Sequence, residues 1–373
     1  MACGDSDVRL PAFEDLSKEQ DLIYNLELDG NYLVSGPPGT GKSVMALYRA
    51  QVLTFDDREP DVLMYSNVLR QYTASAAAEV GIEGRVSTFH SWFNAFWQKH
   101  YGKRPPTHAG DSYSYDWDEV PQQFLKKMPD AGTLQDLLVD EGQDLPLGFY
   151  RMTRFLAKNI TVFADENQQL FEQNTTLKEI ATAIAADECL DLKRNYRNSA
   201  EIAAVARVYY EGTPTGVPDP PTRHGDKPTL RHYEQTEDFV DFVARYASGR
   251  TNLTIGIACP DAATQKRLLR LLEAKKLAIP VQAYISSDRS RKVLDFEKPA
   301  ITLVHYRSLK GLEFDTLFVP ELQRAPVDAT SASLRMMFYV VMSRARDELH
   351  LSWSGASDVP PIVAHLEESV SSR

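Results

Sequence analysis

The chain contains two kinds of apolar pattern. One is a short run of consecutive apolar residues, and the other is a longer stretch in which apolar residues recur with a helical period. In the first half, the short apolar runs that end in polar residues are 32–34, 61–66, 86–90, 137–139 and 160–165. The longer runs with helical spacing are 44–52, 69–80 and 147–157. The short runs predict buried strands and the longer runs predict helices. Repeated strand–helix alternation predicts an α/β fold, a parallel sheet with helices on both faces.

The pattern restarts near residue 190. A basic, strand-like stretch at 190–197 precedes an alanine-rich helix at 200–210 and a proline-rich loop at 212–228. Strands and helices then alternate over the stretches 229–233, 238–246, 253–259, 264–275, 280–285, 301–306, 316–320, 334–346 and 348–353. The sequence therefore predicts two α/β domains, residues 1–188 with a small insertion near 92–130 and residues 189–373. The acidic tail after Ser354 is predicted to be loose or to form a terminal helix.

The residues between the first apolar run and the first helix read Gly-Pro-Pro-Gly-Thr-Gly-Lys-Ser. This spacing, between a strand and a helix, predicts a loop that binds the phosphates of a nucleoside triphosphate. Its glycines permit backbone shapes in which consecutive N–H groups point at phosphate oxygens. Lys42 would reach the β- and γ-phosphates, and Ser43 would ligate Mg²⁺. The candidate nucleotide-binding residues of this loop are Gly36, Pro37, Pro38, Gly39, Thr40, Gly41, Lys42 and Ser43.

Acidic residues follow two of the later strands. Asp140 and Glu141 end the apolar run at 137–139. Downstream of a phosphate loop, such a pair predicts that Asp140 binds the metal and that Glu141 polarises the attacking water. Asp165 ends the run at 160–165, and Gln168 stands three residues beyond it. A glutamine at this place can sense the γ-phosphate by hydrogen bonding.

An aromatic and basic stretch at 92–104 is open to two interpretations. Aromatic rings between basic residues suit stacking on bases beside a phosphate track. The helical spacing of the rings between Trp92 and Trp97 instead favours a helix that buries them in the core. Nearer the N-terminus, Ser17 is predicted to cap a short helix. Gln20 on that helix could read an adenine edge, although a surface glutamine is more often inert.

Composition limits the classes of protein that the chain can belong to. With 373 residues, 43% of them hydrophobic and 25% charged, it has the balance of a globular protein. No apolar run approaches the roughly 20 residues of a membrane span. The net charge of −11 argues against a surface that is a nucleic-acid platform throughout. Cys3, Cys189 and Cys259 have no metal-binding spacing and are expected to be free thiols in a reducing cytoplasm.

Taken together and in this order, the motifs resemble superfamily 1 helicases of the UvrD/Rep-like type over residues 16–353. The resemblance implies two RecA-like P-loop NTPase domains with ATP in the cleft between them. It matches Gln20 to the adenine-reading glutamine of that family. It matches residues 139–144 to the metal and catalytic motif, with Glu141 as general base. Asp165 and Gln168 match a G-D-x-x-Q motif, in which Ala164 replaces the glycine.

The second half of the chain carries the other matches to this family. Asn195-Tyr196-Arg197 matches N-Y-R, which implies that Tyr196 stacks on adenine and that Arg197 contacts the γ-phosphate. Residues 310–314 match K-G-L-E-F, which implies that Glu313 approaches the ribose. Residues 339–346 match a helix whose arginine, here Arg344, is the implied arginine finger. Cleft closure would then complete the site, and ATP turnover would move the two domains against each other.

The resemblance also implies contacts with a nucleic-acid strand. The candidates for these contacts are Tyr65, Asn67, Thr88, His90, His305 and Arg307. The first four could equally be ordinary strand-end residues, and Arg307 stands where the family commonly has a histidine. After Phe171 the second aromatic residue and the arginine of the family pattern are missing. The large insertions of the family are also reduced.

Two functional interpretations follow. The first is an ATP hydrolase of the helicase or translocase type that moves on single-stranded DNA or unwinds a duplex, with RNA as the alternative to DNA. The resemblance to the family implies 3′-to-5′ polarity. The second is a helicase-like ATPase that acts as a motor or switch subunit of a larger complex and needs a partner protein for nucleic-acid handling. The complete set of motifs favours the first interpretation. The acidic charge and small size favour the second.

Overall fold

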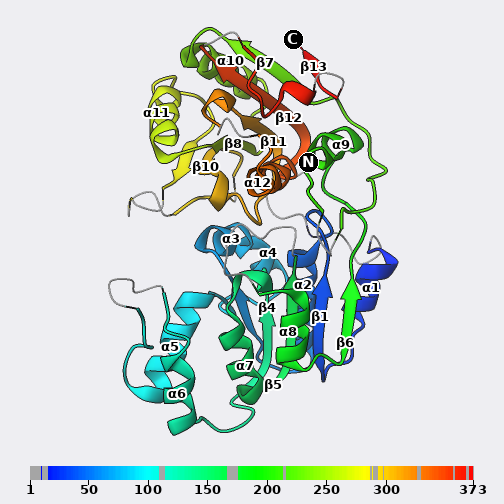
Figure 1. Cartoon of the computed structure of the whole chain (residues 1–373), viewed down its shortest axis with the longest axis vertical. Helices are drawn as coiled ribbons and strands as arrows, with labels where there is room; N and C mark the ends of the chain where they lie inside the picture. The colour runs from blue at the N-terminus through cyan, green and yellow to red at the C-terminus, as the bar shows by residue number, and fades with distance from the viewer. Residues whose placement is uncertain are drawn as a thin grey trace. The chain divides into compact units, whose positions relative to one another are not determined.

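The chain has an α/β architecture built on two parallel sheets, as the sequence predicts (Figure 1). The computed structural model describes residues 10, 16–108, 114–165, 175–212, 216–285, 288, 293–296, 298–325, 329–355, 358–366 and 369–372. These residues divide into two units. The N-terminal unit comprises Leu10–Gly36 and Gly41–Leu192, and the C-terminal unit comprises Pro37–Thr40 and the residues from Lys193 onward. Two parallel sheets with helices packed on them are consistent with two RecA-like domains.

The sheet of the N-terminal unit has six strands in the order β3-β2-β4-β5-β1-β6. Their bounds are β1 Asn31–Ser35, β2 Asp61–Met64, β3 Val86–Thr88, β4 Leu134–Val139, β5 Ala157–Ala164 and β6 Glu188–Asp191. Neighbouring strands pair in parallel, as β1 does with β5 and β6. The carboxyl ends of parallel strands lie at one edge of a sheet. The residues that follow β1, β4 and β5 therefore share that edge.

The helices of this unit include four that begin at a residue whose side chain accepts a backbone N–H. Their bounds are α1 Lys18–Tyr24, α2 Lys42–Phe55, α3 Asn67–Tyr72, α4 Ala74–Glu79, α5 Phe89–Tyr101, α6 Glu119–Lys126, η2 Gly142–Asp144, α7 Leu147–Leu156 and α8 Leu177–Ile184. The predicted cap at Ser17 is confirmed, because its hydroxyl accepts the Gln20 N–H. The prediction of a single helix at 69–80 is wrong, because two helices, α3 and α4, occupy this stretch. The Thr73 hydroxyl donates to the Leu69 carbonyl (3.0 Å), and the helix is divided there into α3 and α4.

The aromatic side chains of α5 form part of the core of the N-terminal unit. Phe93 and Trp97 are fully buried, and Trp92 and Phe96 are nearly so. The core interpretation of this stretch is therefore confirmed, and these rings are not exposed for stacking on bases. The strand predicted at 86–90 ends earlier, at Thr88, because the Thr88 hydroxyl caps α5.

The sheet of the C-terminal unit has seven strands in the order β13-β7-β12-β11-β8-β10-β9. Their bounds are β7 Thr229–Tyr233, β8 Ile255–Cys259, β9 Val281–Tyr284, β10 Ile301–His305, β11 Phe314–Val319, β12 Ala345–Ser354 and β13 Ser371–Ser372. The pairs are again parallel. The helices are α9 Ala200–Arg207, α10 Thr236–Ser248, α11 Ala262–Glu273, α12 Ala332–Met342, η5 Tyr306–Ser308, η6 Leu322–Arg324 and η7 Ala364–Leu366.

Three predicted elements of the second half of the chain differ in the structure. Of the strand-like stretch at 190–197, only the first two residues lie in a strand. They form the end of β6, which ends at Asp191 and pairs with β1. The helix predicted at 334–346 ends at Met342, and β12 begins three residues later, at Ala345. The described residues of the tail are neither loose nor part of a terminal α-helix, because Val363 and Leu366 are buried and β13 pairs with β7. Among the described helices, none combines the length and the apolar character that crossing a membrane requires.

Candidate active site

The phosphate loop joins β1 to α2 at the carboxyl edge of the N-terminal sheet. Gly39 and Gly41 have φ angles of 87° and 90°, in the region that favours glycine, whereas Gly36 does not. A Cβ atom at Gly41 would lie 2.7 Å from Nε2 of Gln20, so this position also lacks room for a side chain. The structure thus brings Gln20, which is buried, beside the loop. Gly41, the N-cap of α2, has no side chain that could cap the helix. A helix N-terminus of this kind is suited to binding an anion.

Lys42 is the buried first residue of α2. Its Nζ donates to the Gly36 carbonyl (2.6 Å) and lies 3.5 Å from Oδ2 of Asp165. Asp165 follows β5 and is completely buried. The fold therefore brings these two residues together although they are 123 positions apart in the sequence. Gln168, predicted beside them, lies outside the described residues.

Asp140 follows β4 and is almost completely buried. Its Oδ1 accepts the N–H of Glu141 (3.0 Å), and its Oδ2 has no hydrogen-bond partner among the described residues. Burial and the neighbouring charge of Glu141 raise the pKa of Asp140 to about 7, against the opposing effect of Ser43 and Lys42. A buried carboxylate oxygen without a partner is unfavourable. A cation bound to Asp140 would remove that penalty.

The donor set fits Mg²⁺ better than a metal held by many side chains. The described part of the chain contains no group of three His, Cys, Asp or Glu side chains placed to hold a metal ion. Mg²⁺ is commonly bound through one or two carboxylates and completes its shell with water and substrate phosphates. Asp140, with its partnerless oxygen, and the Ser43 hydroxyl that affects its pKa are a set of this kind.

Glu141 is held in an unusual backbone conformation. Its φ of 54° lies in the left-handed region, which few residues other than glycine adopt. Nε2 of Gln143 donates to Oε2 of Glu141 (2.7 Å), and Oε1 of Gln143 accepts the N–H of Asp165 (2.8 Å). Gln143 therefore links the ends of β4 and β5 and orients the Glu141 carboxylate. In the sequence, Gln143 is recognisable only as part of the motif at residues 139–144.

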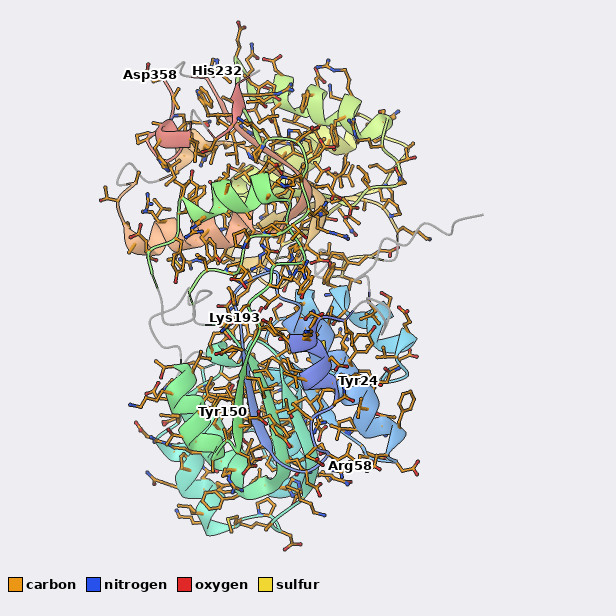
Figure 2. The ribbon with its side chains drawn as sticks, turned by 90° about the vertical axis from the view of Figure 1, so that its right-hand side faces the viewer. Tyr24, Arg58, Tyr150, Lys193, His232 and Asp358 are labelled. Atoms are coloured by element: carbon orange, nitrogen blue, oxygen red, sulfur yellow. The ribbon has the colours of Figure 1, made fainter. Side chains whose placement is uncertain are left out.

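Gly142 has a steric reason to be glycine. A Cβ atom here would lie 2.4 Å from Cγ1 of Val162 and 2.7 Å from the Tyr150 hydroxyl. The Tyr150 hydroxyl donates to the Gly142 carbonyl (2.6 Å) from inside the N-terminal unit, where Figure 2 labels it. Close packing on both sides of the turn thus fixes the backbone next to Glu141.

The same turn recurs in the C-terminal unit after β11. Glu321 has a φ of 60° and accepts Nε2 of Gln323 (3.0 Å), whose Oε1 accepts the N–H of Ser354 (3.2 Å). There, Nη2 of Arg267 lies 2.9 Å from the Glu321 carboxylate and neutralises it. Asp140, which directly precedes the N-terminal turn, has an oxygen without a hydrogen-bond partner among the residues that the structure describes. The N-terminal turn thus retains a carboxylate that a metal ion could neutralise.

Arg197 lies in the segment between β6 and α9. Its Nε donates to Oε2 of Glu313 (2.7 Å), and its Nη1 is buried without a hydrogen-bond partner in the described ranges. Oδ1 of Asn195 accepts the Arg197 N–H (2.9 Å) and holds the segment. The structure therefore joins Arg197 and Glu313, and it leaves one guanidinium donor that an anionic oxygen could satisfy.

Tyr196 is the exposed member of this segment, with 40% of its surface accessible. The guanidinium of Arg194 lies 5.3 Å from its ring centroid. Its backbone N–H donates to the carbonyl of Gly39 (2.9 Å), which belongs to the same unit. The ring is thus accessible for the stacking that the sequence predicts. In the same unit, Thr40 donates its hydroxyl to the Pro37 carbonyl (2.9 Å).

Arg344 stands between α12 and β12 and is almost completely buried. Its Nε donates to the Val340 carbonyl (3.1 Å). Nδ2 of Asn198 donates to the carbonyls on both sides of Arg344, those of Ser343 (3.1 Å) and Ala345 (2.5 Å). Asn198 therefore fixes the backbone that carries Arg344. This role of Asn198 is not apparent from the sequence, because the partners are 145 and 147 positions apart.

The predicted strand-binding residues of the N-terminal unit follow β2 and β3, at the same edge as the phosphate loop. Three of them also have local contacts. Oδ1 of Asn67 accepts from Arg70, Thr88 caps α5, and the His90 ring lies 5.3 Å from that of Tyr115. Tyr65 packs partly buried against the core. The structure thus gives these residues structural roles as well.

His305 and Arg307 lie at the end of β10 in the C-terminal unit. Nδ1 of His305 accepts the Arg307 N–H (3.2 Å), and the Arg307 side chain is exposed. Burial lowers the pKa of His305, which keeps the ring neutral at neutral pH. Of this pair, Arg307 is therefore the residue whose charge is accessible to a phosphate.

No protein-family model matches the chain, and no curated protein matches it either. Among solved structures, the chain is similar to the C-terminal domain of a possible DNA helicase from Lactobacillus plantarum WCFS1, with 22% sequence identity and a TM-score of 0.36. The similarity covers 48% of this chain and 98% of that domain. A similarity this weak carries no information about activity.

Proposed function

We propose that the chain is an ATP hydrolase that moves on single-stranded DNA. The ATPase part rests on one observation, the buried Asp140 beside Glu141 at the phosphate-loop edge, with an oxygen that lacks a hydrogen-bond partner among the described residues. Buried charge without compensation is strongly unfavourable, so this arrangement favours a bound cation. The DNA part rests on the resemblance of the sequence motifs to superfamily 1 helicases.

Four side chains of the N-terminal unit have direct roles in this proposal, those of Lys42, Ser43, Asp140 and Glu141. Ser43 and Asp140 would hold Mg²⁺, which when bound neutralises negative charge on the phosphates. Lys42 would exchange its contact with the Gly36 carbonyl for oxygens of the β- and γ-phosphates. Glu141, oriented by Gln143, would accept a proton from the attacking water.

The arginines of the C-terminal unit would stabilise the charge that develops on the γ-phosphate. Arg197 offers a buried donor, and the contacts of Asn198 hold the backbone on either side of Arg344. Lys42 and Glu141 belong to the N-terminal unit. Turnover would therefore need groups of both units, and this requirement would couple hydrolysis to their relative movement.

A second candidate function is that of an ATPase subunit within a larger complex. The local contacts of Asn67, Thr88 and His90, together with the buried rings of α5, favour this alternative because they occupy side chains that could otherwise bind a strand. A partner protein would then handle the nucleic acid.

ATP turnover with Mg²⁺, measured without nucleic acid, with oligo(dT) and with oligo(rU), tests both functions. Oligo(dT) is expected to raise the rate. Glu141→Gln is expected to lower turnover by about 10²–10⁴-fold while nucleotide binding is retained, and Lys42→Ala is expected to weaken binding itself. Equal turnover in Glu141→Gln and wild type would refute the ATPase assignment. Turnover that neither oligonucleotide stimulates would favour the subunit function.

A further inference from the structure

A hollow of the C-terminal unit is lined by residues of β7, β12 and α10. Figure 1 labels these three elements. Thr229 on β7 pairs with His350 on β12, and Arg231 shares their face because alternate residues of a strand point to the same side. Helix α10 contributes Phe242 and Tyr246 to the lining. The hollow encloses about 510 Å³. Pockets for small molecules measure roughly 300–1,000 Å³.

Cationic side chains outnumber carboxylates around this hollow. The cations in its lining are Lys227, Arg231, Arg245 and Arg250, and the carboxylates are Asp226 and Glu348. The resulting excess of two positive charges occurs on a chain whose net charge is −11. The excess is thus a local feature and does not follow from the general composition. A concave surface with this charge attracts anions.

Two of the arginines are held in place by aromatic rings. The guanidinium carbon of Arg231 lies 4.4 Å from the ring centroid of Phe242, and that of Arg250 lies 4.1 Å from the ring centroid of Tyr246. Nε of Arg250 also lies 3.9 Å from the Glu348 carboxylate. Guanidinium groups that are ordered before binding lose little conformational entropy when they bind an anion.

Arg231 also has an unsatisfied donor. Its Nε is buried and has no hydrogen-bond partner within the part of the chain described. Because a buried donor without a partner is unfavourable, an anionic oxygen at this point would stabilise the site. Planar guanidinium donors are well suited to phosphate oxygens.

We propose that this hollow binds a small phosphorylated molecule. A phosphate monoester carries about two negative charges at neutral pH, which matches the excess of two positive charges in the lining. Asp226 and Glu348 would repel the continuous negative charge of a nucleic-acid strand. The enclosed volume likewise suits a small molecule, whereas a strand would need an extended track.

The test uses the full chain with Lys42→Ala, so that phosphate binding at the loop is weakened. Isothermal titration calorimetry with inorganic phosphate and with glycerol phosphate is expected to show saturable binding of both, with Kd below about 1 mM. Arg231→Gln and Arg245→Gln are each expected to weaken binding about tenfold. Arg270→Gln, at an exposed arginine of α11 outside the hollow, is the matched control and should leave binding unchanged.

Saturable binding that both variants weaken would support the proposal. Three results would overturn it: no binding up to about 10 mM, a range that covers the Kd expected above; equal binding in the variants; or binding of an oligonucleotide without binding of either probe. Arg231 is partly buried, so Arg245→Gln, at an exposed position, carries the test if Arg231→Gln unfolds. With Lys42 intact, Arg245→Gln should leave ATP turnover unchanged, which separates this proposal from the ATPase function.

Discussion

Replacing Asp140 by asparagine is expected to stabilise the protein while abolishing its turnover. Asparagine keeps an oxygen that can accept the Glu141 N–H and removes the buried negative charge. The pKa of Asp140 is raised from 3.8 to about 7, mainly by burial. At about 1.4 kcal/mol for each pH unit, this shift corresponds to an upper limit of about 4 kcal/mol against the carboxylate in the folded state. Water entry and local relaxation reduce this value, so we expect a gain of about 1–3 kcal/mol at pH 8.

The sign of the pH dependence follows from the direction of the shift. A carboxyl group whose pKa is higher in the folded state destabilises that state only where the group is ionised. The penalty is absent below pH 3.8, grows as pH rises, and is complete above about pH 7. The free energy of unfolding of Asp140→Asn should therefore exceed that of wild type at pH 8, and most of this difference should be lost at pH 4.5.

Urea unfolding in EDTA, followed by tryptophan fluorescence, measures this difference. Trp92, Trp97 and Trp117 belong to the N-terminal unit and only Trp353 to the other, so the signal mainly reports the unit that contains Asp140. Addition of Mg²⁺ and ADP should stabilise wild type more than the variant, which lacks the carboxylate proposed to bind the metal. Asp130→Asn, which removes the same charge from an exposed position, should change stability by less than about 0.5 kcal/mol. A variant less stable than wild type at pH 8, or a gain equal at both pH values, would refute the reasoning.

Three further substitutions test how neighbouring residues build the site. Arg344→Lys should lower turnover by about 10³-fold or more and preserve nucleotide binding, since lysine does not reproduce the guanidinium geometry; equal turnover would contradict the assignment. Asn198→Ala should lower the free energy of unfolding by about 1–3 kcal/mol, because the carbonyls beside Arg344 lose their donor. It should also reduce kcat more than it changes KM. Loss of stability with unchanged kcat would indicate a structural role alone. Gly142→Ala should lower the free energy of unfolding by about 1–3 kcal/mol, because its Cβ would lie 2.4 Å from Val162; Gly249→Ala, where the nearest atom is 3.9 Å away, is the control for denaturant unfolding.

The local features of the site were accessible from the sequence because the signal for each lies within a few residues. The strand–glycine loop–helix order predicted the phosphate loop, and the structure shows Gly39 and Gly41 with positive φ. Asp140 was predicted at the end of its strand for the same reason. The predicted bounds of helices and strands were wrong where contacts between distant parts of the chain determine which element forms. The tail beyond Ser354 is held by β7, and the end of α12 is followed three residues later by a strand that pairs with β11.

The sequence by itself determined the α/β class of the fold, the glycine-rich loop between β1 and α2, and the acidic residues at the strand ends. These depend on hydrophobic period and local backbone preference, which act over a few residues. Only the tertiary structure decided that Gln143 joins Glu141 to the Asp165 backbone, that Asn198 holds the peptides around Arg344, and that Asp140 keeps an oxygen without a partner among the described residues. Whether a polar group has a hydrogen-bond partner depends on side chains that are distant in the sequence. When the group is buried, the lack of a partner carries a large free-energy penalty.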